Sequence, residues 1–225
     1  MKQLPISLGA LALACASTSY AQSSEVLTGL PGLACEAVLC LSSSLRPGEC
    51  AASVSHYFDI RKYYKGMLDW EATVDARRFF LGMCPVSAEP GMSARMDAIS
   101  RGAGKCDPDY LNATYGKDIY RYRVVGSNYL GIPAIRDLSL IKTVTLTKLP
   151  AYCLVYNDHE WTYDLSTKYV GDPNRGGYWV SATDYDQAQS KWNAEHTGSW
   201  ASNWHYSSED PRRNIDDSSG TGNNH

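Results

Sequence analysis

The cysteines are the most informative reactive residues of this chain, because their number and spacing distinguish disulfides from a metal site. Seven occur; Cys15 lies in the apolar N-terminal stretch, and the other six are Cys35, Cys40, Cys50, Cys84, Cys106 and Cys153. Thiolates bind zinc or oxidise to disulfides, and zinc sites usually draw on closely spaced pairs such as C-x-x-C. No such pair occurs here and the gaps are irregular. The pattern predicts three structural disulfides and no metal site, with their connectivity open.

The other polar residues form no catalytic signature. The sequence contains no G-x-S-x-G, no H-E-x-x-H and no phosphate-binding glycine motif. Glu36 has no obvious carboxylate partner, which a glycosidase requires, and the histidines lack the spacing of metal ligands. The net charge of −3 argues against a large nucleic-acid surface. We therefore expect no enzyme activity, no cofactor and no nucleic-acid partner.

Two groups of side chains are candidates for contact with a partner protein. Arg77 and Arg78 precede two phenylalanines. Aromatic residues accumulate toward the C-terminus, and four tryptophans are the candidates there: Trp179, Trp192, Trp200 and Trp204. Arginine and tryptophan are enriched in interfaces. A solvated helix face or an internal ion pair is the alternative for the arginines, and core packing or stacking on sugars is the alternative for the tryptophans.

Residues 1–21 have the layout of a secretory signal peptide. A basic start precedes the apolar run 6–16, and Ser19 and Ala21 are small residues at the −3 and −1 positions of a cleavage site. The apolar run is too short to anchor the chain in a bilayer, and no later segment is long and apolar enough to span one. We predict cleavage before Gln22 and export to the periplasm, with a lipoprotein signal at Cys15 as the alternative.

Hydrophobic periodicity predicts a helical first half, 22–112, that positions most of the cysteines. Apolar residues between 30 and 41 recur at helical spacing, and further helices are predicted near 47–58, 69–83 and 92–101. Cys35 and Cys40 lie five residues apart on the first helix, so they point to different faces and cannot easily bond to each other. Cys40 with Cys50 is the best single pairing, because it would clip the first two helices together.

The second half is strand-like. The segments 120–125, 140–146 and 152–156 are alternating, β-branched or aromatic, and 178–180 follows a turn. We expect 113–206 to form a strand-containing, aromatic-rich extension packed on the helical domain, with a helix from Thr183 to His196. The polar, glycine-rich residues 207–225 predict a disordered tail. The expected fold class is therefore mainly α: a small disulfide-stapled helical bundle followed by this extension.

The order of the cysteines along the chain and the short sequence segments between them resemble those of a known family. The chain resembles the TrbM/KikA family of conjugal transfer proteins in four runs: Leu33 to Ser43, Arg46 to Cys50, Arg77 to Pro85 and Ala98 to Asp107. The likeness is strong over about 28–112 and fades through the strand-rich part. In the matched part, five cysteines correspond as structural residues: Cys35, Cys40, Cys50, Cys84 and Cys106. Cys153 and the aromatic C-terminal region lie outside it.

The resemblance implies a periplasmic, non-enzymatic accessory or assembly component of a plasmid conjugative transfer system, which is a type IV secretion system. Its partners would be other mating-pair-formation proteins, reached by protein–protein contact. The alternative is a protein that binds or acts on peptidoglycan, using the Trp/Tyr residues with Glu36 or Glu71. A secreted inhibitor or effector with a disulfide core is a third hypothesis.

Overall fold

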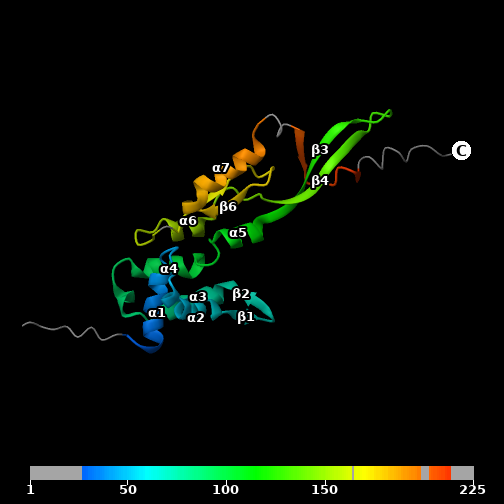
Figure 1. The fold of residues 1–225 in the computed structure, drawn as a ribbon. Helices are drawn as coiled ribbons and strands as arrows, with labels where there is room; N and C mark the ends of the chain where they lie inside the picture. Colours follow the sequence, from blue (N-terminus) through cyan, green and yellow to red (C-terminus); the bar gives the residue numbers. More distant parts are fainter. Residues whose placement is uncertain (1–26, 164, 199–202, 214–225) are drawn as a thin grey trace, which may run out of the picture.

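The structure of this chain is a computed structural model that describes residues 27–163, 165–198 and 203–213. The predicted signal peptide (1–21), Trp200 and the last part of the predicted tail (214–225) lie outside the described residues. Figure 1 shows the first three helices at one end of the molecule. The strand β6 (Tyr178–Ser181) and the helix α7 (Tyr185–His196) lie on the far side of α4 (Met92–Gly102) from these helices. A long hairpin of β3 (Gly116–Ser127) and β4 (Pro133–Val144) extends away from the body.

The N-terminal part of the described residues contains four α-helices: α1 (Gly29–Cys40), α2 (Ala51–Asp59), α3 (Trp70–Leu81) and α4 (Met92–Gly102). Two short 3-10 helices, η1 (Gly48–Cys50) and η2 (Pro85–Ala88), precede α2 and α4. Asp69 caps α3, because its carboxylate accepts a hydrogen bond from the Ala72 N–H at 3.0 Å. All four helices lie close to the predicted ranges.

A short hairpin between α2 and α3 was not predicted. Its strands are β1 (Lys62–Tyr64) and β2 (Met67–Asp69), paired antiparallel. Lys65 and Gly66 connect them with φ values of 50° and 82°. Two consecutive positive φ angles suit a tight hairpin turn, and glycine adopts such angles without strain.

The main hydrophobic core, which we call the disulfide core, joins α1 to α4 with a segment far along the chain. It contains these buried residues: Ala34, Ala37, Val38, Leu41, Tyr57, Phe80, Leu81, Cys84, Met92, Met96, Ile99, Ala103, Cys106, Cys153, Tyr156 and Leu165. Cys153 and Tyr156 come from α6 (Ala151–Asn157), which packs on α4. The predicted strand at 152–156 is therefore wrong.

The packing of α6 explains that error. Tyr152 to Tyr156 have high strand propensity, yet Cys153 and Tyr156 are three residues apart and both are buried on one helix face. Gly102 ends α4 beside this face, and a Cβ there would lie 2.5 Å from the Tyr156 Cβ. Close helix packing and a disulfide at Cys153 therefore override the local preference for a strand.

The rest of the described residues form a second unit with a core of its own. After α5 (Pro108–Tyr115), β3 (Gly116–Ser127) and β4 (Pro133–Val144) make a long hairpin, which we call the arm (116–144). A third strand, β7 (Trp204–Ser207), pairs with β3, so the sheet order is β4-β3-β7. The pair β5 (Thr167–Val170) and β6 (Tyr178–Ser181) is followed by η3 (Ala182–Asp184) and α7 (Tyr185–His196). Leu111, Val144 and Trp179 form the centre of its second core.

The predicted fold class, mainly α with an aromatic-rich extension, is wrong. The described part of the chain is mixed α and β with three antiparallel sheets. The sequence signal was weak because the arm is solvated on much of both faces, so its twelve-residue strands lack strict alternation. No helix in these ranges has the length and apolar composition that a membrane span requires.

Candidate functional site

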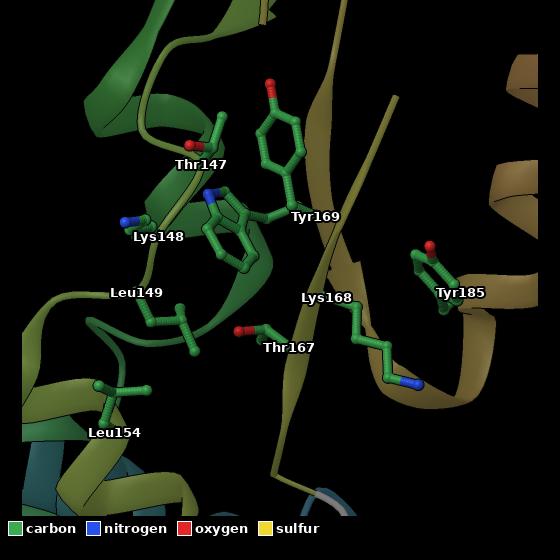
Figure 2. A pocket seen from close by; sticks show the side chains of 9 residues that line it. Thr147, Lys148, Leu149, Leu154, Thr167, Lys168, Tyr169 and Tyr185 are labelled. Atoms are coloured by element: carbon green, nitrogen blue, oxygen red, sulfur yellow. The ribbon is translucent and has the colours of Figure 1, made fainter. Parts of the chain in front are cut away.

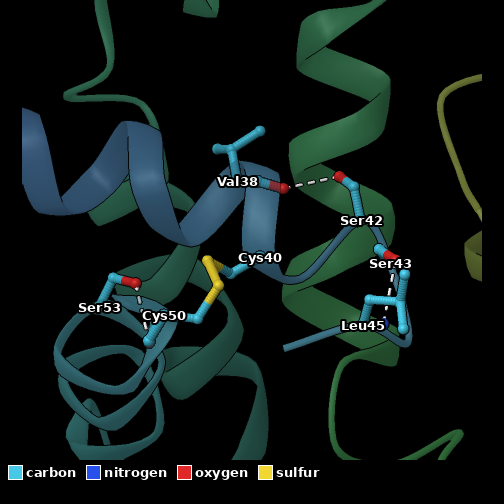
Figure 3. Close-up of a disulfide and its surroundings, with 7 residues drawn as sticks. All are labelled: Val38, Cys40, Ser42, Ser43, Leu45, Cys50 and Ser53. Atoms are coloured by element: carbon cyan, nitrogen blue, oxygen red, sulfur yellow. Dashed lines mark hydrogen bonds between the residues drawn. A yellow bond between two sulfur atoms is a disulfide. The ribbon is translucent and has the colours of Figure 1, made fainter. Parts of the chain in front are cut away.

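Three disulfides connect the six predicted cysteines. The pairs are Cys35–Cys84, Cys40–Cys50 and Cys106–Cys153. The pairing of Cys40 with Cys50 confirms the one that the sequence favoured, and Figure 3 shows it joining the end of α1 to the start of α2. The other two bonds join segments 49 and 47 residues apart. All three are placed to hold helices together.

A buried arginine, not singled out by the sequence, ties three helices together. Arg95 of α4 is fully buried, and its guanidinium donates to Tyr156 O at 3.1 Å and Leu41 O at 3.4 Å. These carbonyls lie at the C-terminal ends of α6 and α1, where a positive charge is favourable. Burial lowers the pKa of Arg95 and raises that of Tyr156, whose phenol donates to Leu41 O at 2.6 Å.

The predicted contact residue Arg77 lies inside the protein. Only 6% of it is exposed, and its guanidinium carbon lies 4.7 Å from the centre of the Tyr57 ring. Its Nε donates to Ile60 O at 3.2 Å. These contacts join α3 to α2, and they leave little of Arg77 for a partner protein.

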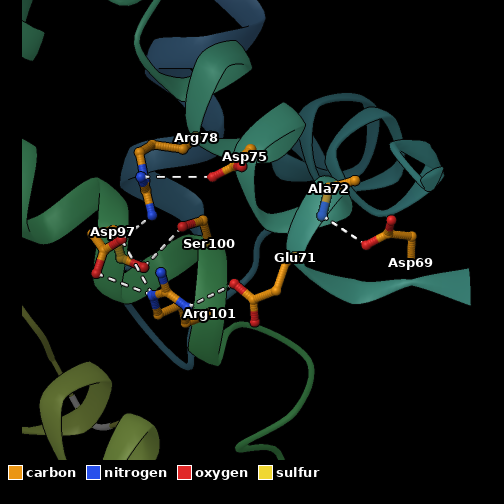
Figure 4. Close-up of polar contacts among 8 residues, drawn as sticks. All are labelled: Asp69, Glu71, Ala72, Asp75, Arg78, Asp97, Ser100 and Arg101. Atoms are coloured by element: carbon orange, nitrogen blue, oxygen red, sulfur yellow. Dashed lines mark hydrogen bonds and ion pairs between the residues drawn. The ribbon is translucent and has the colours of Figure 1, made fainter.

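Arg78 is half-exposed and belongs to an ion-pair network between α3 and α4. Figure 4 shows its guanidinium reaching Asp75 and Asp97, while Arg101 contacts both Asp97 and Glu71. Asp97 therefore lies between two arginines from different helices. Exposed ion pairs contribute little individually, and a shared carboxylate adds mainly geometric order.

The tryptophan candidates do not form one cluster. Trp179 is buried in the second core, where its Nε1 donates to Leu146 O at 2.8 Å. Trp192 is buried on α7, and its ring stacks on His196 at 4.1 Å. Trp204 lies on β7 beneath the guanidinium of Arg121, 3.9 Å from the ring centre. Each ring that the structure describes thus has an internal partner.

An open cavity of about 680 Å³ lies beside the second core, whose Trp179, Tyr169 and Leu149 contribute to its lining. Nine residues line it: Thr147, Lys148, Leu149, Leu154, Thr167, Lys168, Tyr169, Trp179 and Tyr185. Figure 2 shows Lys148, Leu149 and Leu154 on one side, Lys168 and Tyr185 on the other, and Thr167 between them. The lining is mostly apolar with two lysines and no carboxylate. Such a surface suits an apolar group that carries negative charge.

Thr167 and Tyr169 carry two of the hydroxyl groups in the lining of this cavity. Thr167 is only 8% exposed, and its Oγ1 is buried with no hydrogen-bond partner among the described residues. Tyr169 donates from its hydroxyl to Val144 O at 2.5 Å. Burial, reinforced by Asp172, raises the pKa of Tyr169 to about 12, so the phenol remains a donor at neutral pH.

Sequence reasoning missed Arg95, Lys148 and Thr167. Arg95 lies on the apolar stripe of its helix with Met92, Met96 and Ile99, and a charge on such a stripe is a usable signal. Lys148 and Thr167 carry no comparable signal, because the segments that bring them together are distant in the sequence. In the described ranges, no group of three His, Cys, Asp or Glu side chains is arranged to hold a metal ion.

Comparison with known proteins gives one match. The chain matches the protein family described as TrbM over residues 26–193. No curated protein and no solved structure matches it. The family match extends past the strong resemblance at 28–112, so it includes Cys153 and every residue that lines the cavity. It ends before β7.

Proposed function

Because this chain belongs to the TrbM family of conjugal transfer proteins, we propose that it is a periplasmic, non-enzymatic component of a plasmid conjugative transfer system. It acts as an accessory or assembly factor of this type IV secretion system by contacting other mating-pair-formation proteins. The family match over residues 26–193 carries this proposal.

The disulfides support the periplasmic part of the proposal. Disulfides form and persist in oxidising compartments such as the bacterial periplasm, and the three bonds use every cysteine after residue 21. The N-terminal pattern at 1–21 is that of a cleavable signal. N-terminal sequencing of the protein from a periplasmic fraction should start at Gln22. Recovery from the cytoplasm with residues 1–21 attached would contradict export.

Exposed apolar side chains at two hairpin tips support protein–protein contact. Tyr129 and Leu130 at the tip of the arm are 94% and 66% exposed. Met67 in the β1–β2 hairpin is 72% exposed, with Tyr63 and Tyr64 beside it. Apolar groups gathered at protruding tips are typical of interaction sites. Trp179 and Trp192, by contrast, are only 4% and 9% exposed, which leaves little of either ring for stacking on a sugar.

In-cell photocrosslinking during mating tests the contact. A photoreactive phenylalanine analogue at Tyr129 or Met67 should capture secretion-channel or pilus proteins, identified by mass spectrometry. The matched control places the same analogue at Phe80, which is buried. Capture of wall fragments or wall enzymes alone would replace this proposal with the peptidoglycan hypothesis.

A further inference from the structure

The strand β5 has one open edge, and the cavity described above reaches it. Among the described residues, β5 pairs with β6 alone, in a two-stranded sheet. Side chains alternate between the two faces of a strand, so Thr167 and Tyr169 lie on one face of β5 and Lys168 lies on the other. All three line the cavity. A single space can touch both faces only around the edge that β6 leaves open.

The hydrogen-bond pattern shows which backbone groups point toward that edge. The Ala182 N–H donates to Ser166 O at 2.8 Å, which makes Thr167 and Ser181 a non-hydrogen-bonded pair of the antiparallel ladder. The next such pair is Tyr169 with Trp179. The N–H and C=O groups of Thr167 and Tyr169 therefore point away from β6. Among the described residues, no other group bonds to them.

The open edge is short because α7 closes one end of it. Gln189 of α7 accepts a hydrogen bond from the Gly171 N–H at 3.1 Å. An added strand can therefore use the backbone groups of Thr167 and Tyr169, and it must end before Gly171. Unpaired strand edges are sites where extended peptides add to a sheet, and pockets for alternate side chains give specificity.

We propose that this cavity binds a short extended segment of a partner protein, which adds alongside β5 and carries an acidic residue next to an apolar one. The apolar side chain packs against Leu149 and Leu154, and the carboxylate is held by Lys148 or Lys168, which lie on opposite sides of the cavity. The proposal rests on the proposed function as a contact protein and names where, and with what chemistry, one contact is made.

Charge and polar chemistry both favour an acidic segment. Lys168 lies over the Tyr185 ring, with its Nζ 5.0 Å from the ring centre, and neither lysine has an ion-pair partner in the described ranges. No Asp or Glu lines the cavity to repel a carboxylate. Thr167, whose hydroxyl has no partner among the described residues, is one of the residues that line it. Rotation about χ1 can offer this oxygen to a bound segment.

A peptide array tests this proposal with the full disulfide-bonded protein. The probes are immobilised overlapping twelve-residue peptides that cover the periplasmic and pilus proteins of the same transfer system. We expect binding to peptides that join an acidic residue to an apolar one. Binding should weaken at least tenfold for Lys168→Glu or Lys148→Glu and remain unchanged for the control Lys191→Glu, an exposed lysine of α7 outside this cavity. Proline at the centre of a bound peptide should abolish binding, because it removes a ladder donor.

Thr167→Val distinguishes a binding role from a structural one. The substitution removes an unpartnered buried hydroxyl at nearly constant shape, so the melting temperature should hold or rise while peptide affinity falls about fivefold. No peptide binding, or binding that Lys168→Glu and Thr167→Val leave unchanged, overturns the proposal. Binding to purified sacculi alone also overturns it. If crosslinks from Tyr129 or Met67 still capture transfer proteins in that case, the proposed function stands and only this site is refuted.

Discussion

The disulfide core and the arm are held in place by different interactions. In the core, the helices α1 to α4 and α6 converge on buried side chains, the Cys35–Cys84 and Cys106–Cys153 bonds lie in or against it, and Arg95 bonds to two helix ends. The arm has two twelve-residue strands in which only Ile119, Thr143 and Val144 are buried. Backbone pairing and exposed ion pairs such as Arg123–Asp137 hold it together.

Because of this difference, the residues that stabilise the protein are not the residues that are exposed to a partner. Each buried apolar side chain contributes roughly 1.5–3 kcal/mol, whereas an exposed ion pair contributes about 0–1 kcal/mol. The strongly stabilising interactions are therefore concentrated in the disulfide core. The arm and the β1–β2 tip can expose apolar residues because the core does not depend on them. Five experiments test this difference between the core and the arm.

Removing a long-range disulfide should have the largest effect. Replacing Cys106 and Cys153 together by serine should destabilise the protein by about 4 kcal/mol, because the bond closes a long loop in the unfolded chain. The same change at Cys40 and Cys50, ten residues apart, should cost about 3 kcal/mol. Denaturant unfolding under non-reducing conditions measures both. Equal losses at the two sites would contradict the loop-length argument.

The biological consequence of losing a disulfide is depletion of the protein. Cys84→Ser breaks the bond to Cys35, and we expect conjugation frequency and the steady-state protein level to fall together. Immunoblotting beside a mating assay measures this. A normal protein level with failed transfer would instead indicate a direct role for that cysteine.

Arg95→Met should have an intermediate effect within the core. Charge-assisted hydrogen bonds to Tyr156 O and Leu41 O are lost, which we expect to cost about 2 kcal/mol. Tyr156→Phe, which removes one neutral hydrogen bond to Leu41 O, should cost about 1 kcal/mol. Thermal unfolding compares the two variants. If Arg95→Met left stability unchanged, the buried guanidinium would not be the clip between helix ends that the contacts describe.

Lowering the pH should destabilise the protein by a smaller amount, through His196 where α7 lies beside β7. Burial lowers the pKa of His196, which stacks on Trp192 and lies 6.2 Å from the Tyr206 ring of β7. As the pH falls through the ordinary histidine value near 6.5, the unfolded chain takes up a proton that the folded protein disfavours, so stability falls. Denaturant midpoints at pH 7.5 and 5.5 should differ less in His196→Gln than in the unmodified protein. An equal difference would remove His196 from this explanation.

The tip of the arm should contribute almost nothing to stability. Replacing Tyr129 and Leu130 together by serine should change the unfolding free energy by less than about 0.5 kcal/mol, since both side chains are solvated. Conjugation frequency should nevertheless fall at least tenfold at a normal protein level. Leu45→Ser, a similarly exposed leucine in a loop, is the matched control. A large loss of stability in the variant with both tip residues replaced would contradict the proposed difference between core and arm.

Much of the first half could be predicted from the sequence. The apolar spacing around Ala34, Ala37 and Val38 predicted α1, and the six cysteines predicted three disulfides. These features depend on residues near one another in the chain, or on counting. The segment around Tyr152 failed for the opposite reason, because its Tyr156 packs against Gly102, which lies on a helix far earlier in the sequence.

The family resemblance, the disulfide chemistry and the helical periodicity could be predicted from the sequence, because local spacing and residue type encode them. The three-dimensional fold was needed to show which cysteines pair at long range, that Arg77 and Trp179 are buried, and that Lys148 lies across a cavity from Lys168. Burial and juxtaposition arise from contacts between segments far apart in the chain, and no local pattern records which segments will meet.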